Sequence, residues 1–418
     1  MSFAGGNFSG NTDWDGMSTG RPTCFDAAVI GAGPAGCSAA LELARKGCAV
    51  VLIEKAALPR YKTCGGGVLP RAFKLLPPGV QSAVERSFNS VALYFLGSDL
   101  NFVAARPQPM VYMTMRAELD RLLAREAEKA GAQLVESCPV RQVNVQADHV
   151  EIVSDEKNFQ AKFVIAADGV HSVTAKAAGW PELPALAPAL EHEIYVAADE
   201  LARFSRMPRF DFNAIDAGYA WVFPKRTHLS VGILSTRRVC PNLRSKLADY
   251  LQQLGLTRIE QTERHGYMIP LAPRRGPLAR GRVLLAGDAA GLVDPVTAEG
   301  ISHAIQSGQL AATALTDGRL DAARVSPLYQ ALLEQNILGE LRAGRFLARL
   351  LYRHHHLRNS AFRLGGQRLC EFVADVVLGE RCYRDAVKRP SSYLKLLGWW
   401  PSGSRARPAA PNNSTRHA

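Results

Sequence analysis

The stretch "FDAAVIGAGPAGCSAALELARKGCAVVLIEK", residues 25–55, decides the fold. An apolar run over 27–30 predicts a buried strand, and residues 34–46 follow with the spacing of an amphipathic helix. A second apolar run over 49–53 predicts another strand. The order strand, helix, strand within about thirty residues is typical of a β-α-β unit.

Glycines lie at the turn of this unit. Gly31, Gly33 and Gly36 form G-x-G-x-x-G between the strand and the helix. Glycine there permits a tight turn and lets a pyrophosphate approach the helix N-terminus. Glu54 ends the second strand, where a carboxylate accepts hydrogen bonds from a ribose. The pattern predicts a dinucleotide site but does not distinguish FAD from NAD.

The bulk composition is that of a globular enzyme-sized protein. Its 418 residues exceed one small core, so we expect two domains or one domain with an insertion. Apolar runs stay shorter than the roughly 18 residues that cross a bilayer. The N-terminus lacks the pattern of a secretory signal. Eight cysteines without a C-x-x-C pair indicate reduced thiols. We expect a cytoplasmic protein without a bound metal.

The net charge of +12 is concentrated at one end. Residues 336–418 hold 15 of the 50 Lys and Arg but 5 of the 38 Asp and Glu. The rest of the chain is therefore nearly neutral, and we expect no nucleic-acid partner.

Two later blocks repeat the pattern of a buried strand that runs into an acidic turn. "KFVIAADGVHS", residues 162–172, supplies Asp168 and Gly169. "RVLLAGDAAGLVDPVTAEGI", residues 282–301, supplies Gly287 and Asp288, and then Gly300 and Ile301 at the start of a helix. The positive end of that helix suits the anionic edge of a reduced flavin. Between the blocks lie runs typical of antiparallel strands.

With these fingerprints in this order, residues 25 to about 330 resemble the FAD-dependent p-hydroxybenzoate hydroxylase-like superfamily. Arg116 in "MRAELDRLL" matches an arginine that supports the cofactor in that superfamily. Each acid taken alone would be an ordinary turn or cap. In all, the expected cofactor-binding residues are Gly31, Gly33, Pro34, Ala35, Gly36, Glu54, Lys55, Cys64, Gly65, Gly66, Arg116, Val140, Asp168, Gly169, Gly287, Asp288, Gly300 and Ile301.

Two segments, "YKTCGGGV" (61–68) and "GYAWVFPK" (218–225), resemble the geranylgeranyl reductase family, whose members saturate isoprenoid double bonds. Bare backbone at Gly65 to Gly67 would let the chain pass flat against the isoalloxazine ring, with Cys64 facing the reaction cavity. The alternative is a flexible crossover in which Cys64 is a small buried hydrophobe.

Strand periodicity places Tyr219, Trp221 and Phe223 on one face as an apolar wall for a polyprenyl chain. The alternative for each ring is ordinary sheet core. With Gly67 and Lys225 they complete the expected substrate residues, Lys225 being either a solvated turn residue or a partner for a diphosphate.

Saturating an isolated alkene takes a hydride from flavin N5 and a proton from an acid on the other side. The resemblance implies that Cys64 or an ordered water takes part in this protonation. The expected catalytic residues are Cys64 and Tyr219, with His303 a weaker candidate that is more simply structural. No second nucleotide fingerprint is present, so the electron donor is either transiently bound NADPH or a reduced ferredoxin.

The predicted fold is α/β, with a discontinuous Rossmann-type FAD-binding domain, an inserted antiparallel β-sheet substrate domain and a C-terminal helical region. The expected boundaries are 1–22 for an N-terminal tail; 23–75, 105–180 and 265–335 for the FAD-binding domain; 76–104 and 181–264 for the substrate domain; 336–400 for the helical region; and 401–418 for a basic tail.

The helical region carries Arg342, Arg345, Arg349 and Arg353 on one stripe. This stripe either contacts anionic lipid, making the protein peripheral on a membrane, or is solvated while the helix packs on the flavin domain. The sequence leaves the oligomeric state open.

Two other functions share the evidence. "GYAWVFP" nearly matches the G-W-x-W-x-I-P segment of flavin halogenases, so a flavin-dependent monooxygenase or halogenase is the first alternative. A non-enzymatic redox sensor based on Cys64 is the second. Ala298 departs from the glycine that many relatives have at this position.

Overall fold

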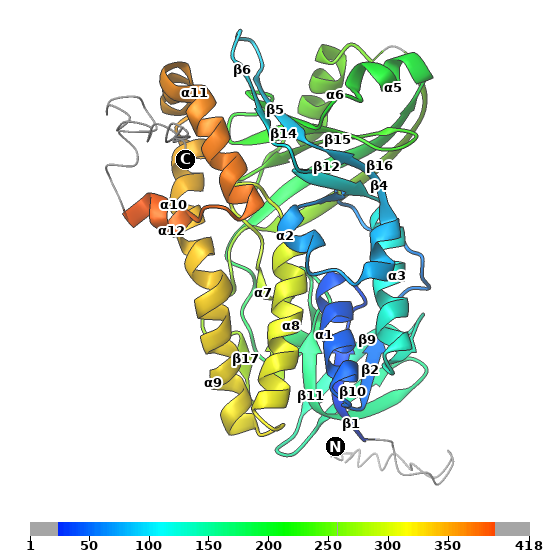
Figure 1. Cartoon of the computed structure of the whole chain (residues 1–418). Helices are drawn as coiled ribbons and strands as arrows, with labels where there is room; N and C mark the ends of the chain where they lie inside the picture. The colour runs from blue at the N-terminus through cyan, green and yellow to red at the C-terminus, as the bar shows by residue number, and fades with distance from the viewer. Residues whose placement is uncertain (1–23, 257, 389–418) are drawn as a thin grey trace, which may run out of the picture.

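The computed structural model describes residues 24–256 and 258–388 (Figure 1). The predicted tails at 1–22 and 401–418 lie outside the described residues, as does the end of the predicted helical region. In Figure 1 the sheet that contains the β-α-β unit and the helices beside it form the lower part of the molecule, and a second sheet with the C-terminal helices forms the upper part.

An eight-stranded sheet forms around the G-x-G-x-x-G unit. Its strands β18, β11, β1, β2 and β8 run parallel, and β17, β10 and β9 add antiparallel pairs. The bounds are β1 Cys24–Ile30, β2 Val50–Ile53, β8 Gln133–Val135, β9 Val140–Val145, β10 Val150–Ser154, β11 Asn158–Ala166, β17 Ala279–Arg280 and β18 Val283–Leu285. Residues 27–30 of β1 and all of β2 and β18 are apolar and buried, because helices cover this sheet.

Figure 1 shows α1, α3 and α8 side by side against this sheet, with α9 beside α8. Their bounds are α1 Pro34–Arg45, α3 Arg116–Lys129, α8 Ile301–Asp317 and α9 Ala322–Leu333, and the short α4 Val173–Ala177 and α7 Gly287–Ala290 follow strands β11 and β18. Helices α1 and α8 touch backbone to backbone, because a Cβ on Gly308 would lie 2.1 Å from the Ala35 carbonyl oxygen.

A seven-stranded sheet carries the second half of the site. Its order is β16-β12-β15-β14-β13-β5-β6, with bounds Ile259–Pro270, Leu186–Val196, Leu229–Ser235, Gly218–Pro224, Arg209–Phe212, Ser90–Phe95 and Asn101–Ala105. Helices α5 (Ala198–Phe204) and α6 (Leu243–Gln253) lie at this sheet. Leu243, Leu247 and Tyr250 of α6 pack on Val231 and Ile233. The predicted boundary at 264/265 falls inside β16, so this sheet extends to Pro270.

A three-stranded sheet, absent from the sequence prediction, packs against the seven-stranded sheet through Val111, Met113 and Phe223. It consists of β3 (Gly67–Val68), β7 (Val111–Thr114) and β4 (Val84–Phe88). The short helix α2 (Pro70–Phe73) and a 3-10 turn over Pro78–Ala83 connect β3 to β4. The glycine run at 65–67 therefore enters a sheet instead of a free crossover.

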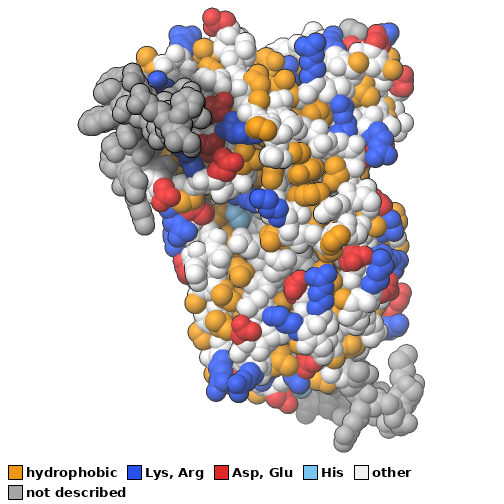
Figure 2. Space-filling model, viewed as in Figure 1, with side chains coloured by type: hydrophobic (Ala, Val, Ile, Leu, Met, Phe, Trp, Pro, Cys, Tyr) orange, Lys and Arg blue, Asp and Glu red, His pale blue; other side chains and the backbone are white. Residues whose placement is uncertain are grey.

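The C-terminal helices are α10 (Gly339–Arg353), α11 (His355–Leu378) and α12 (Tyr383–Lys388), after a π-helical turn at Glu334–Leu338. They pack on the seven-stranded sheet, where Phe362 lies 4.8 Å from Phe95 between ring centres. This region was expected to pack on the flavin domain, but it also packs on the seven-stranded sheet. In Figure 2 hydrophobic side chains gather over the upper part of the visible face, whereas basic and acidic side chains mix below.

We predict that Gly308→Ala destabilises the protein although alanine favours helices. The helix-propensity gain is about 1 kcal/mol, whereas overlap with the Ala35 backbone forces α1 and α8 apart. We expect a net loss of about 2 kcal/mol in the free energy of unfolding. Thermal or urea unfolding measures it, and Gln309→Ala in the same helix is the control. Equal stability of the two variants would contradict the close helix contact.

Candidate active site

One continuous cavity of about 680 Å³ runs between the two larger sheets. One arm lies at the carboxyl ends of β1, β2 and β11, where open α/β sheets bind ligands. The other arm lies under the seven-stranded sheet and α11, and its lining is aliphatic and aromatic. The segment 62–67 lies where the two arms meet.

The predicted cofactor residues come together in the first arm. All of them line the cavity except Gly36, which packs against the Gly31 carbonyl inside the turn. The N-terminus of α1 begins at Pro34, which also lines the cavity, so its free backbone N–H groups point toward it. This arrangement fits the pyrophosphate of a dinucleotide.

Glu54 is held in place by the turn itself. Its Oε2 accepts hydrogen bonds from the Ala32 backbone N–H at 2.9 Å and from Arg60 at 3.3 Å. Arg60 also binds the fully buried Asp120, which pairs in addition with Arg116. The two guanidinium groups neutralise two buried carboxylates, so Glu54 and Asp120 have their partners within the protein itself. Arg60 and Asp120 were not predicted, because their partners lie on other elements.

Two aspartates complete this arm. Asp168 Oδ2 accepts from the Thr174 backbone N–H and hydroxyl, whereas its buried Oδ1 has no partner among the described residues. Burial raises the pKa of Asp168, against the hydrogen bonds from Ser172 and Thr174. Asp288 accepts from the Tyr267 hydroxyl at 3.2 Å. An unpartnered carboxylate oxygen in the cavity wall fits a ligand that brings its own hydroxyl donors.

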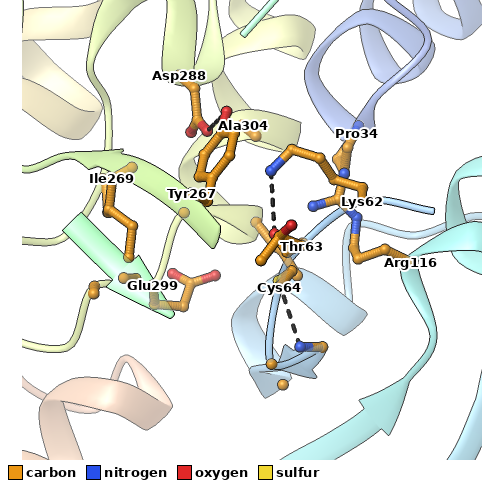
Figure 3. Close-up of a pocket in the computed structure, with 18 of the residues that line it drawn as sticks. Pro34, Lys62, Thr63, Cys64, Arg116, Tyr267, Ile269, Asp288, Glu299 and Ala304 are labelled. Atoms are coloured by element: carbon orange, nitrogen blue, oxygen red, sulfur yellow. Dashed lines mark hydrogen bonds between the residues drawn. The ribbon is translucent and has the colours of Figure 1, made fainter. Parts of the chain in front are cut away.

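Figure 3 shows Lys62, Thr63 and Cys64 between Arg116 on one side and the Tyr267–Asp288 pair on the other. Lys62 Nζ lies 3.3 Å from the centre of the Tyr267 ring, and burial, followed by the charge of Arg116, lowers its pKa. Cys64 Sγ accepts a hydrogen bond from the Gly66 backbone N–H at 3.4 Å. Lys62 was missed because a lysine beside a glycine run carries no sequence signal of its own.

The thiol of Cys64 also faces the guanidinium of Arg116. Burial alone would lower the pKa of Arg116, but Asp120 and then Cys64 outweigh burial and raise it. Cys64 is half-buried and packs against the core of the first domain. The structure thus places the thiol in the cavity wall, with a cation beside it.

Gly65 and Gly66 are required by the packing of the protein itself. A Cβ on Gly65 would lie 2.8 Å from the Phe223 ring, and one on Gly66 would lie 2.0 Å from the Thr114 carbonyl oxygen. Gly66 also adopts a φ of +67°, which favours glycine. The expected reason for these glycines was contact with a flavin ring, and the structure adds contact with the aromatic wall and with β7.

Lys225 has a different environment from both of those expected for it. It is fully buried, does not line the cavity, and its Nζ donates to the carbonyl oxygens of Gly65 at 2.6 Å and Thr114 at 2.9 Å. The prediction of a solvated turn residue or a diphosphate partner is therefore wrong. The chain turns inward after Pro224, and the ammonium group fastens the glycine loop to β7.

Tyr219, Trp221 and Phe223 all line the cavity from one face of β14, as their alternation predicts. The Tyr219 hydroxyl donates to the Thr297 carbonyl oxygen at 2.6 Å, and burial raises its pKa. Ala298, next to Thr297, has a φ of +56°, a conformation that favours glycine. Tyr219 therefore supports the segment before α8, and its hydroxyl hydrogen is engaged in a hydrogen bond to a carbonyl oxygen.

The C-terminal helices close the second arm. Leu351, Tyr352, Phe362 and Val377 line it, and Tyr352 donates to the Val296 carbonyl oxygen. Sequence analysis placed this region outside the site, since nothing in a basic amphipathic helix reveals what its apolar face covers.

Two further findings concern ionisable groups. His303 is buried outside the cavity, where burial and then Arg71 lower its pKa, so it lacks access to a substrate. Glu191, which was not predicted, is 1% exposed and lines the cavity.

In the described part of the chain no cluster of His, Cys, Asp and Glu suits a metal, and no helix is long and apolar enough to span a membrane.

Comparisons with known proteins agree with this geometry. Residues 25–210 match the family model of an FAD binding domain. Digeranylgeranylglycerophospholipid reductase 1 from Methanopyrus kandleri is 31% identical over 309 residues, which are 69% of this chain and 79% of that protein.

Solved structures share the fold. A geranylgeranyl bacteriochlorophyll reductase-like protein from Thermoplasma acidophilum matches with a TM-score of 0.70 and 22% identity over 90% of this chain and 96% of that one. The halogenase PltM in complex with phloroglucinol and FAD matches with a TM-score of 0.64 and 16% identity over 90% and 85%.

The fold and the cavity define an FAD-dependent oxidoreductase, and the predicted α/β fold class is confirmed. The chain belongs to the geranylgeranyl reductase family.

We predict that Gly66→Ala and Gly67→Ala differ sharply. The first adds left-handed strain, about 1–3 kcal/mol, to an overlap with β7 that costs about 1–3 kcal/mol. The second places its Cβ 3.4 Å from Val111, an ordinary contact, and should cost less than about 1 kcal/mol. Thermal unfolding and FAD content of the purified variants measure this. Similar losses in both would refute the proposed packing of the loop.

Proposed function

We propose that this protein saturates carbon–carbon double bonds of a prenyl chain of the geranylgeranyl type. The observation that carries the proposal is the continuity of the cavity: a polar arm suited to FAD opens directly into an apolar arm, and Cys64 lies at their junction. Membership of the geranylgeranyl reductase family supports the same reaction.

Residues of the first arm would hold FAD. The α1 N-terminus and Glu54 suit the pyrophosphate and a ribose, and Asp288 suits a hydroxyl of the ribityl chain. The N-terminus of α8 at Gly300, whose backbone lines the cavity, suits the edge of the ring that becomes anionic on reduction. Bound FAD, once reduced, supplies the hydride of the reaction.

The second arm recognises hydrocarbon. Rings from β13 and β14 and from the C-terminal helices form its wall; they are Phe210, Phe212, Tyr219, Trp221, Phe223, Tyr352 and Phe362. Burial of each methylene of the substrate contributes about 0.8 kcal/mol. Lys225 already donates its hydrogen bonds to backbone carbonyl oxygens. The protein therefore recognises the hydrocarbon chain of the substrate more than a diphosphate group beside Lys225.

Cys64 is the residue we assign to protonation. Saturation adds a hydride to one alkene carbon and a proton to the other, so an acid must reach the cavity. The Cys64 thiol is there, whereas the Tyr219 proton is held by Thr297. The electron donor that we propose is NADPH, bound transiently, or a reduced ferredoxin.

The fold shared with halogenases leaves oxygen-dependent chemistry as the second candidate. The near match of "GYAWVFP" to their motif favours it, and the glycine loop after Cys64 favours the reductase. A redox sensor based on Cys64 is a third.

We predict that anaerobic incubation with FAD, dithionite and geranylgeranyl diphosphate yields products heavier by two hydrogens per saturated bond. The rate of Cys64→Ala should be at least about tenfold lower, because a general acid contributes roughly 10²–10⁴-fold and water partly replaces the missing thiol as the proton donor. This variant should still bind FAD. Cys48→Ala, outside the cavity, is the control. A requirement for oxygen would favour the second candidate, and full activity of Cys64→Ala would remove the thiol from the mechanism.

We further propose that the protein contacts anionic membranes through the corner between α10 and α11. Phe346, Leu350 and Leu357 are 48%, 46% and 67% exposed there, and Arg349 and Arg353 are exposed beside them. Apolar side chains flanked by cations suit the headgroup region of a bilayer. A substrate dissolved in lipid would then enter next to the helices that line the apolar arm.

We predict that Arg349→Glu with Arg353→Glu weakens binding to phosphatidylglycerol vesicles about thirtyfold or more, because each cation contributes about 1 kcal/mol. Cosedimentation at low salt measures it. Arg237→Glu with Arg244→Glu, two exposed sites on the seven-stranded-sheet domain, is the control of equal charge. Equal loss in both variants, or no binding by the wild type, would contradict this surface.

A further inference from the structure

Glu191 is a carboxyl group buried in the wall of the active-site cavity. Its side chain is 1% exposed, and Oε1 accepts a hydrogen bond from the Ser230 hydroxyl at 2.6 Å. Oε2 is buried and has no hydrogen-bond partner among the described residues. A carboxyl oxygen in this situation is costly unless it carries a proton or meets a ligand.

The sheet register places this group beside the aromatic wall. Trp221, Gly232 and Glu191 are opposite one another on β14, β15 and β12, so their side chains share one face. Gly232 has no side chain, and the Trp221 ring occupies the space above it, where a Cβ would lie 2.1 Å from the ring. The indole Nε1 is also buried without a partner in the described chain. Two unpartnered polar groups therefore face the same cavity.

Glu191 is also adjacent to the loop that carries the thiol. The Lys225 ammonium and the backbone N–H of Cys64 favour its charged form. Burial, followed by the charge of Glu193, acts more strongly in the opposite direction and raises the pKa of Glu191 to about 7. Near neutral pH this carboxyl group therefore both holds and releases a proton, as a general acid must.

A chain of hydrogen-bonded polar side chains connects the neighbouring Glu193 to solvent. Glu193, two residues along β12, is 1% exposed and accepts from the Tyr61 hydroxyl at 3.3 Å. Its other oxygen is 3.1 Å from Nε2 of the buried His228. His228 Nδ1 lies 3.1 Å from the hydroxyl of Thr227, which is exposed, and Tyr61 is 38% exposed. Both branches reach the surface.

We propose that Glu191 is the proton store of the active site, which reprotonates Cys64 after each reduction and is refilled from solvent through Glu193. This inference rests on the proposed function and goes beyond it. In each cycle the Cys64 S–H bond breaks and its proton forms a C–H bond with the alkene π electrons, as hydride from reduced FAD bonds to the other carbon. The Glu191 O–H bond then breaks to restore the thiol, and the carboxylate takes a proton from solvent.

The direction of each transfer is reasonable. The thiolate that remains after the alkene has taken its proton is a base, and the protonated carboxyl group of Glu191 beside the Cys64 loop is the acid that restores the thiol. The charged and titratable groups that surround Glu191 are Cys64 and Tyr61 from the loop, Glu193 from β12, Lys225 and His228 from the turn between β14 and β15, and His265 from β16.

The test uses Glu191→Gln in the FAD-loaded enzyme. We expect one double bond per active site to be saturated at the wild-type rate, because Cys64 begins protonated, and later turnovers to be roughly 10²-fold slower. The wild-type steady rate should fall as pH rises through about 7, and the variant should lack this fall. Glu260→Gln, an exposed carboxyl on β16, is the matched control. Wild-type steady turnover by Glu191→Gln with an unchanged pH profile would overturn the proposal.

A second measurement does not depend on turnover. Infrared difference spectra of the oxidised protein between pH 5 and 9 should show a protonated carboxyl band that titrates near 7 and is missing from Glu191→Gln. Persistence of that band in the variant would overturn the proton store. If the wild type reduced no prenyl compound while the band behaved as expected, the proposed function would fail and the protonation of Glu191 would stand.

Discussion

The buried ammonium of Lys225 is the contact on which the site depends. It binds the Gly65 carbonyl oxygen of the loop and the Thr114 carbonyl oxygen of β7. A buried charge must have such partners, and hydrogen bonds to charged groups contribute about 1.5–3 kcal/mol each. Because β7 leads directly into α3 and Arg116, one side chain directly after β14 fixes the loop, the aromatic wall and the cofactor arm relative to one another.

The two arms of the cavity depend on different parts of the chain, and the loop is where they are coupled. The cofactor arm is built from turns that follow parallel strands, with Glu54 and Asp120 held by arginines. The apolar arm is built from an antiparallel sheet and from helices that come last in the sequence. The segment before α8 belongs to both, because Tyr219 and Tyr352 hold its carbonyl oxygens from the apolar side.

What could be predicted from the sequence was local chemistry. Gly31, Asp168 and Asp288 carry their signal within a few residues, since a strand, a turn and a helix N-terminus are contiguous. The side chains of β14 followed from a period of two. Lys225 was misread because a lysine after proline has the pattern of a surface turn, and its burial depends on a loop 160 residues away.

Glu191 shows why the rest of the site was out of reach. Alternation in "ALEHEIYV" marks Leu190 and Ile194 as inward and the glutamates as solvated. Helix α6 covers one face of the seven-stranded sheet, and the other face looks into the protein interior, where the cavity lies. The glutamates on that second face are therefore buried too. Periodicity identifies two faces of a strand but does not reveal that a cavity, and not water, lies beyond the polar one.

The charges behind the glycine loop set which proton the fold retains. A protonated Glu191 is the less costly form where water is excluded, because burial and then the charge of Glu193 oppose its ionisation. A carboxyl group whose folded-state pKa is raised from 4.5 to about 7 contributes stability below its unfolded pKa, and this contribution is lost as pH rises through 7. Removing the proton therefore works against folding, so the packed protein draws a proton back from solvent. The burial that removes water from Glu191 therefore also favours the return of its proton.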